Sequence, residues 1–216
     1  MKNLFYIMGK SSTGKDTIYQ EIKNKIEINS YIRYTTRPKR ANEKNGREYF
    51  FISNKQLEAF EKSNKIMESR SYNVINNNGK ADIWTYATIA DEQLEKRGDF
   101  LTIGTLASYN TLRKYIQEHP ETDIKIIPIY INVSEDEIRK RAIKREEKQE
   151  KPNYEEMERR LNADNIDFST SKLKQARISN KETFYNYNLN KCVNKIIKYI
   201  KEKEGENWKE FKLKFF

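Results

Sequence analysis

The chain has 216 residues, enough for one domain with a sizeable core, and its 36% apolar and 12% aromatic residues exclude a chain that is disordered by composition. The chain has 42 Lys and Arg residues against 32 Asp and Glu, a net charge of +10 that suits phosphate binding. A solvated lysine-rich surface explains most of this charge, so the positions of the arginines are more informative than the net charge itself. A single cysteine, Cys192, excludes an internal disulfide framework, and a single histidine, His119, argues against a histidine-built metal site.

Strands and helices alternate along much of the chain. Residues 4–8 (LFYIM) form an apolar run of buried-strand length, and residues 16–28 carry isoleucines at helical spacing. Further along, the pattern predicts a strand over 99–103, a helix over 106–118, a strand over 124–133, and a helix capped by Ser134 with Glu137 completing a capping box. This alternation predicts an α/β fold with a mainly parallel sheet.

Two segments depart from that alternation. Residues 33–90 mix turns, such as Asn45-Gly46 and 76–79 (NNNG), with aromatic strands, and they predict a small β-rich lobe inserted into the core. Residues 142–160 are almost purely charged, so we expect a mobile, solvated lid that cannot bury a face of its own. The predicted division is a core of 1–32, 91–141 and 161–200, a lobe of 33–90, a lid of 142–160 and a C-terminal tail of 201–216, whose aromatics, Trp208 among them, we expect to pack on the core or on a second chain.

A glycine-rich loop joins the first strand to the first helix. It reads GKSSTGK and fits G-x-x-x-x-G-K, the spacing of a P-loop, in which backbone N–H groups converge on a phosphate at the positive end of a helix. A structural glycine turn is the alternative, but the strand before the loop and the helix after it favour phosphate binding. The residues predicted to bind a nucleotide here are Gly9, Ser11, Ser12, Thr13, Gly14, and Lys15, which would reach the β- and γ-phosphates.

Asp16 stands where this motif usually has a serine or threonine, and Thr17 follows it. A carboxylate at this place can hold Mg²⁺ directly or through water, although it adds negative charge beside the phosphates. Asp16 is equally explained as a first-turn helix residue that the helix dipole favours. Both interpretations stay open.

A second cationic cluster lies at 35–40 (TTRPKR). Arg37 and Arg40, three residues apart beside a proline turn, can grip one phosphate with forked donors, and the hydroxyl of Tyr49 can add a hydrogen bond. Alone, such a cluster would be a charged exposed turn. In combination with the P-loop it predicts a site for a second phosphate.

Together these segments resemble the guanylate kinase family, whose pattern after the P-loop runs T-T-R-x-P-R-x-G-E-x-x-G-x-x-Y-x-F; this chain reads TTRPKRANEKNGREYFF. The proline stands one place earlier and Asn42 replaces a glycine. The resemblance covers about residues 3–200. Further segments that resemble the family are 66–68 (IME), 86–88 (YAT), the arginine-bearing lid and Asn186. It implies a P-loop NTPase core with a parallel sheet and flanking helices, an inserted acceptor-binding lobe and a small mobile lid.

The resemblance also implies the reaction ATP + GMP to ADP + GDP with Mg²⁺, and roles for particular residues. Arg37, Arg40 and Tyr49 would hold the acceptor phosphate, and Glu68, Tyr86 and Thr88 would face the acceptor and its base. Arg145 and Arg160 would come from the lid to act with Lys15 and Arg37 in catalysis. Asn186 would lie near the adenine pocket, and Arg141, also on the lid, would contact ATP.

The chain departs from the family pattern where the acceptor base would bind. The family has an aspartate on the strand that is here 101–105 (LTIGT), and Arg33 stands in place of a serine contact. Only Glu68 remains to pair with the N1 and N2 donors of guanine, and a missing partner weakens selectivity by about 1–3 kcal/mol. GMP is therefore the first expectation, and another nucleotide or small phosphorylated molecule is the alternative.

Other functions are weighed against this one. A non-catalytic protein-binding module of guanylate kinase type would not need Lys15 or the lid arginines, and nucleic-acid binding lacks a recognition motif. The expected partners are ATP and GMP, without nucleic acid or membrane, in a monomer or homodimer. No apolar stretch approaches the roughly 20 residues that span a bilayer, and no cleavage signature is present, so a cytoplasmic protein is expected.

Overall fold

A five-stranded parallel sheet forms the centre of the protein. The computed structural model describes residues 1–40, 42–75, 80–150 and 152–215, and the side chains of these residues apart from Ile75 and 206–215. The order of the sheet is β2 (Asn29–Ser30), β7 (Phe100–Ile103), β1 (Lys2–Met8), β8 (Ile124–Asn132) and β9 (Thr183–Tyr185). Every described pairing within it is parallel, as the alternation of strands and helices predicts.

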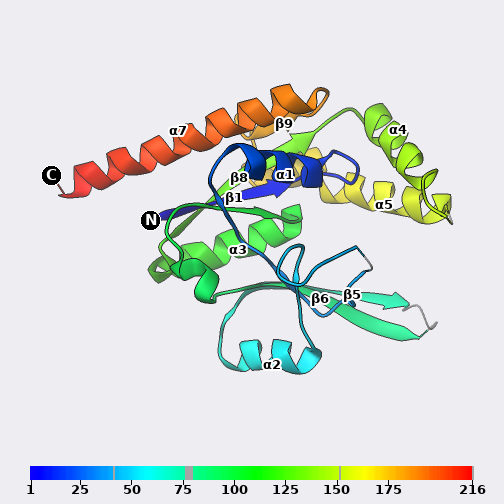
Figure 1. Ribbon diagram of the computed structural model, residues 1–216, viewed down its shortest axis with the longest axis horizontal. Coiled ribbons are helices and arrows are strands. Elements are labelled where there is room, and N and C mark those ends of the chain that lie inside the picture. Colours follow the sequence, from blue (N-terminus) through cyan, green and yellow to red (C-terminus); the bar gives the residue numbers. More distant parts are fainter. Residues whose placement is uncertain (41, 76–79, 151, 216) are drawn as a thin grey trace.

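The central strand β1 is buried on both faces because its side chains alternate between two apolar layers. Leu4, Tyr6 and Met8 pack with the helix α3 (Leu106–Glu118). Phe5 and Ile7 pack on the opposite face, in the layer that contains α1 (Lys15–Lys25) and α7 (Leu189–Phe215). Figure 1 shows this arrangement, with α1 and α7 on one side of the sheet and α3 on the other. The predicted α/β fold is confirmed.

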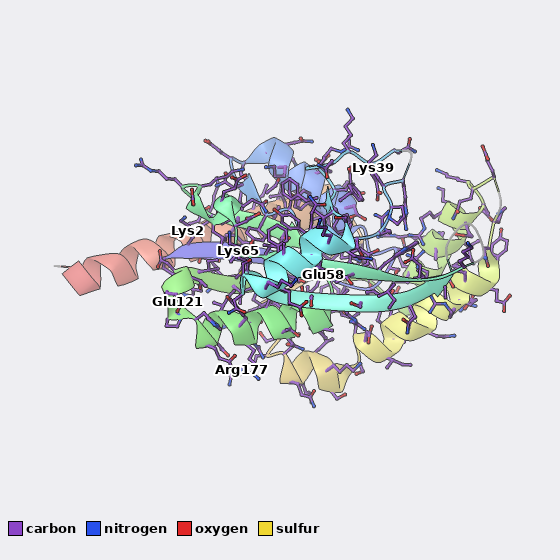
Figure 2. All side chains as sticks on the ribbon, turned by 90° about the horizontal axis from the view of Figure 1, so that it is seen from below. Lys2, Lys39, Glu58, Lys65, Glu121 and Arg177 are labelled. Carbon is purple, nitrogen blue, oxygen red and sulfur yellow. The ribbon has the colours of Figure 1, made fainter. Side chains whose placement is uncertain are left out.

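A second sheet lies outside this core. Its order is β4 (Phe50–Phe51), β3 (Tyr34–Thr35), β6 (Ala81–Ile89) and β5 (Ile66–Ile75), with β3 and β4 parallel and the other pairs antiparallel. The helix α2 (Asn54–Lys62), which begins with a capping box of Ser53 and Gln56, accompanies it, and η1 (Glu92–Glu95) leads back to the core. From below, α2 and the long strands β5 and β6 lie across the near side of the molecule (Figure 2). The β-rich character predicted for 33–90 is therefore present, while the predicted turn at 76–79 lies outside the described residues.

The charged segment after β8 forms two helices, α4 (Glu135–Glu146) and α5 (Tyr154–Asp167). Ser134 caps α4 and accepts from the backbone of Glu137, whose own carboxylate accepts from Arg141. The expectation that 142–160 cannot bury a face is wrong, because α4 and α5 pack through a small apolar cluster. Its members are Val133, Ile138, Ala142, Met157 and Leu161.

Two short helices, η2 (Pro120–Thr122) and α6 (Thr170–Gln175), complete the chain together with α7. The segment predicted as a tail continues α7 as far as Phe215. The side chains of its aromatic residues, Trp208, Phe211, Phe215 and Phe216, lie outside the described residues. Within the described part of the chain, no helix combines the length and the apolar character that a bilayer crossing requires.

The packing of α4 on α5 yields a stability test. Ile138 is 1% exposed in this cluster, so Ile138→Ala should lower the free energy of unfolding by about 2–5 kcal/mol. Ile166 on α5 is 66% exposed, and Ile166→Ala should change it by less than about 0.5 kcal/mol. Urea denaturation followed by circular dichroism checks both, and equal midpoints for the two variants would contradict the buried packing.

Candidate functional site

The loop between β1 and α1 has the backbone of an anion-binding turn. Gly14 has a φ of 90°, in the left-handed region, and begins α1. A Cβ at this position would lie 2.5 Å from Nδ2 of Asn186, so no other residue fits without displacing that side chain. The hydroxyl of Ser12 is buried and has no hydrogen-bond partner among the described residues.

Lys15 lies inside this loop rather than in solvent. Its Nζ donates to the carbonyl oxygen of Lys10 at 2.7 Å. Burial lowers the pKa of Lys15 to about 8; nearby Asp16 and Asp164 oppose the shift, and two arginines, Arg145 and Arg160, add to it. The structure thus places Arg145 and Arg160, two of the residues predicted for the site, close enough to act on Lys15, with two carboxylates that partly compensate these charges.

The helix α5 and the start of α4 close over the loop through contacts that the sequence does not indicate. The carboxylate of Asp164 accepts a hydrogen bond from the backbone N–H of Ser11 at 2.5 Å. Nζ of Lys10 donates to Asn165 at 2.7 Å and forms an ion pair with Glu135. Asp164 therefore uses one of the backbone donors that a phosphate would also use.

A cavity of about 240 Å³ opens beside the loop and gathers most residues predicted for the donor nucleotide. Arg141 and Asn186 are tied to the loop in a chain of hydrogen bonds: Arg141 donates to the carbonyl oxygen of Asn186 at 2.8 Å, and Nδ2 of Asn186 donates to the carbonyl oxygen of Thr13 at 2.8 Å. The cavity is lined by Ser12, Gly14, Lys15, Asp16, Thr17, Arg141 and Arg145.

A second cavity, of about 400 Å³, lies between the core and the second sheet. Arg37 and Arg40 both line it, with Arg37 buried and Arg40 exposed. Tyr49 and Tyr86 also line it, and their rings meet edge to face at 5.5 Å. Two further arginines and two further tyrosines complete the set, so four guanidinium and four phenol groups line the cavity together with three carboxylates: Arg33, Arg47, Tyr19, Tyr31, Asp16, Glu43 and Glu48. Guanidinium and phenol donors around one cavity suit a phosphate.

Arg37 is held by a carboxylate next to that cavity. Its Nη1 and Nη2 donate to the two oxygens of Glu43 at 3.0 and 2.7 Å, and its guanidinium lies over the rings of Tyr49 and Phe51. Burial opposes the charge of Arg37, but the hydrogen bonds to Glu43 outweigh it, so the pKa of Arg37 is raised and that of Glu43 is lowered. Nε of Arg37 is buried without a hydrogen-bond partner among the described residues.

Glu68 and Thr88 lie deeper than the acceptor role implied for them. Both are buried, at 3% and 1% exposure, and both bind the side chain of Arg33, which itself lines the cavity. Of the three residues expected to face the acceptor base, Tyr86 lines the cavity, whereas Glu68 and Thr88 sit behind Arg33. The sequence marks Arg33 only as a departure from the family pattern.

Asp16 lines both cavities, so it stands between the predicted donor and acceptor sites. Within the described part of the chain, no three His, Cys, Asp or Glu side chains gather closely enough to hold a metal ion by themselves. A magnesium ion held mainly by phosphate oxygens and water needs only one or two protein ligands, and Asp16 with the neighbouring Thr17 fits that requirement.

The family of the chain follows from comparison with known proteins. The family model for guanylate kinase matches residues 1–171. A guanylate kinase of Nitrosomonas europaea is 33% identical over 94 residues, 43% of this chain and 46% of that protein, and one of Malacoplasma penetrans is 36% identical over 67 residues, 30% of this chain and 34% of that protein. The chain thus aligns with less than half the length of these curated relatives.

Among solved structures, guanylate kinase from Anaplasma phagocytophilum superposes with a TM-score of 0.61 at 14% identity. The superposition covers 94% of this chain and 86% of that one, which supports the fold. The family model spans the P-loop, the second sheet and both helices that close over the loop. The chain belongs to the guanylate kinase family.

Proposed function

We propose that this protein transfers the terminal phosphoryl group of ATP to the phosphate of a nucleoside monophosphate, with GMP as the first acceptor to test. The observation that carries the proposal is the pair of cavities that share Asp16. One is lined by the P-loop lysine and the other by four arginines, so two phosphate-bearing ligands would meet at their common wall. Such a site catalyses by alignment and charge neutralisation.

On the donor side, the P-loop amides and Lys15 would hold the phosphates of ATP. Arg145 and Arg160, whose charges already act on Lys15, would neutralise the group in transfer. Arg141 and Asn186, joined to the loop through Thr13, would position the nucleoside. The remaining predicted loop residues, Gly9, Ser11, Ser12 and Gly14, shape the backbone around the phosphates.

On the acceptor side, Arg37, Arg40 and Tyr49 would hold the acceptor phosphate. Arg37 is already oriented by Glu43 and by two aromatic rings, so it loses little side-chain entropy on binding. Glu43 has to share or release Arg37 when a phosphate enters. A phosphate acceptor is anionic by itself, so the reaction needs no protein base.

Asp16 and Thr17 are the residues that would hold Mg²⁺. When bound, the ion supplies positive charge to the phosphate oxygens. His119 takes no part in this scheme, because its ring stacks on Tyr115 at 4.0 Å at the far end of α3.

The proposal is tested by ADP release with GMP, dGMP, AMP, CMP and UMP as acceptors. Lys15→Ala should lower the turnover by about a hundredfold to a thousandfold, because the transferring charge loses its buried cation. Lys25→Ala, an exposed lysine at the end of the same helix, is the matched control and should leave the rate within about twofold. If the Lys15→Ala variant kept its turnover and its melting temperature, the catalytic role given to Lys15 would be refuted. If the unaltered protein turned over none of the acceptors, the non-catalytic binding module would be favoured.

Asp164 yields a second test, because its carboxylate competes with a phosphate for Ser11 N–H. Asp164→Asn should tighten ATP binding by about threefold to tenfold, since a like charge a few ångströms away costs about 1 kcal/mol in water-like surroundings. Asp167→Asn, on the same helix but paired with Lys172, should leave the affinity unchanged. Titration calorimetry measures both, and weaker binding by the Asp164 variant would show that this carboxylate supports the nucleotide site instead.

The pKa of Lys15, about 8, predicts a pH dependence. The protonated form binds phosphates, and Lys15 loses its proton as the pH rises through about 8, so ATP affinity should fall between pH 7 and 9. Binding near pH 8 should also take up protons, which calorimetry in buffers of different ionisation enthalpy detects. In Lys15→Arg, which stays charged throughout, this proton uptake should disappear; its persistence would assign the titration to another group.

A further inference from the structure

Arg33 and Glu68 form a buried ion pair at the inner wall of the acceptor cavity. Nη2 of Arg33 donates to Oε2 of Glu68 at 2.5 Å, and the two side chains are 6% and 1% exposed. Thr88 stabilises the pair, since its hydroxyl accepts from Nε of Arg33 at 3.2 Å and donates to the same oxygen of Glu68 at 3.2 Å. Oε2 of Glu68 therefore already accepts from two donors within the protein.

Three parts of the fold hold this pair in place. Glu68 on β5 and Thr88 on β6 are cross-strand partners in the second sheet. The backbone carbonyl of Arg33, just before β3, accepts from Phe50 N at 2.9 Å, and its Nη2 also reaches Ser108 of α3 at 3.4 Å. The position of Arg33 is thus fixed by the second sheet and by the core together.

Tyr6 and Gly104 exclude a further carboxylate from the same wall. A Cβ at Gly104 would lie 1.8 Å from the hydroxyl oxygen of Tyr6 and 3.1 Å from Nη1 of Arg33. No side chain fits at position 104 while Tyr6 is present. The Tyr6 hydroxyl is buried behind the cavity and has no hydrogen-bond partner among the described residues, so at this wall the guanidinium of Arg33 faces the cavity and no acidic group stands beside it.

This composition decides which edge of a base the wall can recognise. A carboxylate accepts from the N1–H and 2-amino donors of guanine, whereas a guanidinium donates to acceptors such as O6 and N7 of a 6-oxopurine. Here Arg33 lines the cavity and neutralises Glu68, so a 2-amino group at this wall would lose its water without gaining a charged acceptor. Three other carboxylates line the cavity away from this wall: Glu43 and Glu48, which are paired with Arg37 and Arg47, and Asp16 at the border with the first cavity.

We propose that Arg33 is a specificity-determining residue that removes the preference for the 2-amino group, so that the site binds inosine monophosphate, a 6-oxopurine nucleotide without that group, at least as well as GMP. This inference rests on the proposed function, because it concerns the acceptor site of the same reaction. The role proposed for Arg33 concerns the choice of base, and the proposed binding of the acceptor phosphate by Arg37 and Arg40 is unchanged.

The first test uses the unaltered protein. Dissociation constants for GMP and inosine monophosphate, measured by calorimetry without ATP, and kcat/KM for both with ATP should favour GMP by no more than threefold or should favour inosine monophosphate. A larger preference for GMP overturns the inference whether or not a variant folds. Normal binding of both nucleotides without any turnover would instead refute the proposed phosphoryl transfer and leave the inference standing; absence of binding would refute both.

The second test alters the pair. Arg33→Ser releases the carboxylate of Glu68, so the ratio of GMP to inosine monophosphate affinity should rise at least tenfold over that of the unaltered protein. Arg33→Lys keeps a cation beside Glu68, and Arg139→Ser replaces an exposed, ion-paired arginine on α4; both should leave the ratio unchanged. A ratio that moves equally in Arg33→Ser and Arg33→Lys, or in neither, would contradict the role given to Arg33. Melting temperatures establish that each variant is folded, and a merely structural role would weaken both nucleotides alike.

Discussion

Positive charge concentrated around one buried ammonium group is the constraint on which the rest of the site depends. Lys15 is enclosed by its own loop, and Arg145 and Arg160 add charge of the same sign nearby. Such a group is costly to bury without an anion. Asp16 and Asp164 supply part of the compensation, and the helices α4 and α5 carry the arginines and Asp164 to the loop. The polyanion of the proposed function would supply the rest of the compensation.

Carboxylates within the chain compensate most of the cations around both cavities, and depth decides which of these pairs can open. Glu135 is 62% exposed beside Lys10, and Glu43 is 15% exposed beside Arg37, so water and incoming phosphate can reach both. The side chain of Glu68, beside Arg33, is only 1% exposed. Breaking that last pair would leave an unpaired charge in the interior, which costs about 3–5 kcal/mol, so we expect it to stay closed during the reaction. In the proposed function, the pairs near the opening would separate when a ligand enters, whereas the buried pair would keep the polarity of the cavity wall unchanged.

The parts of the structure that depend on local pattern could be predicted from the sequence. The strand over 4–8, the glycine loop and the helix over 106–118 follow from spacing alone, and the loop identifies its own chemistry. The packing of α4 on α5 could not be predicted, because each helix contributes only a few apolar residues to the shared cluster and these are separated in the sequence by charged residues. The contact of Asp164 with Ser11 joins residues 153 positions apart, and no periodicity indicates such a partner. Arg33 was visible as an unusual residue, but only the fold shows that it binds Glu68.

The close approach of Gly104 to Tyr6 also constrains how this protein can change over generations. An acidic side chain at 104 would force Tyr6 out of its buried position, and phenylalanine at position 6 would not relieve the contact, because the ring carbon that bears the hydroxyl already lies 2.5 Å from the required Cβ. A smaller residue at 6 would first open a hole in the layer that β1 shares with α3. Descent from this sequence toward a second acidic group at that wall therefore passes through a less stable intermediate, whichever of the two substitutions comes first.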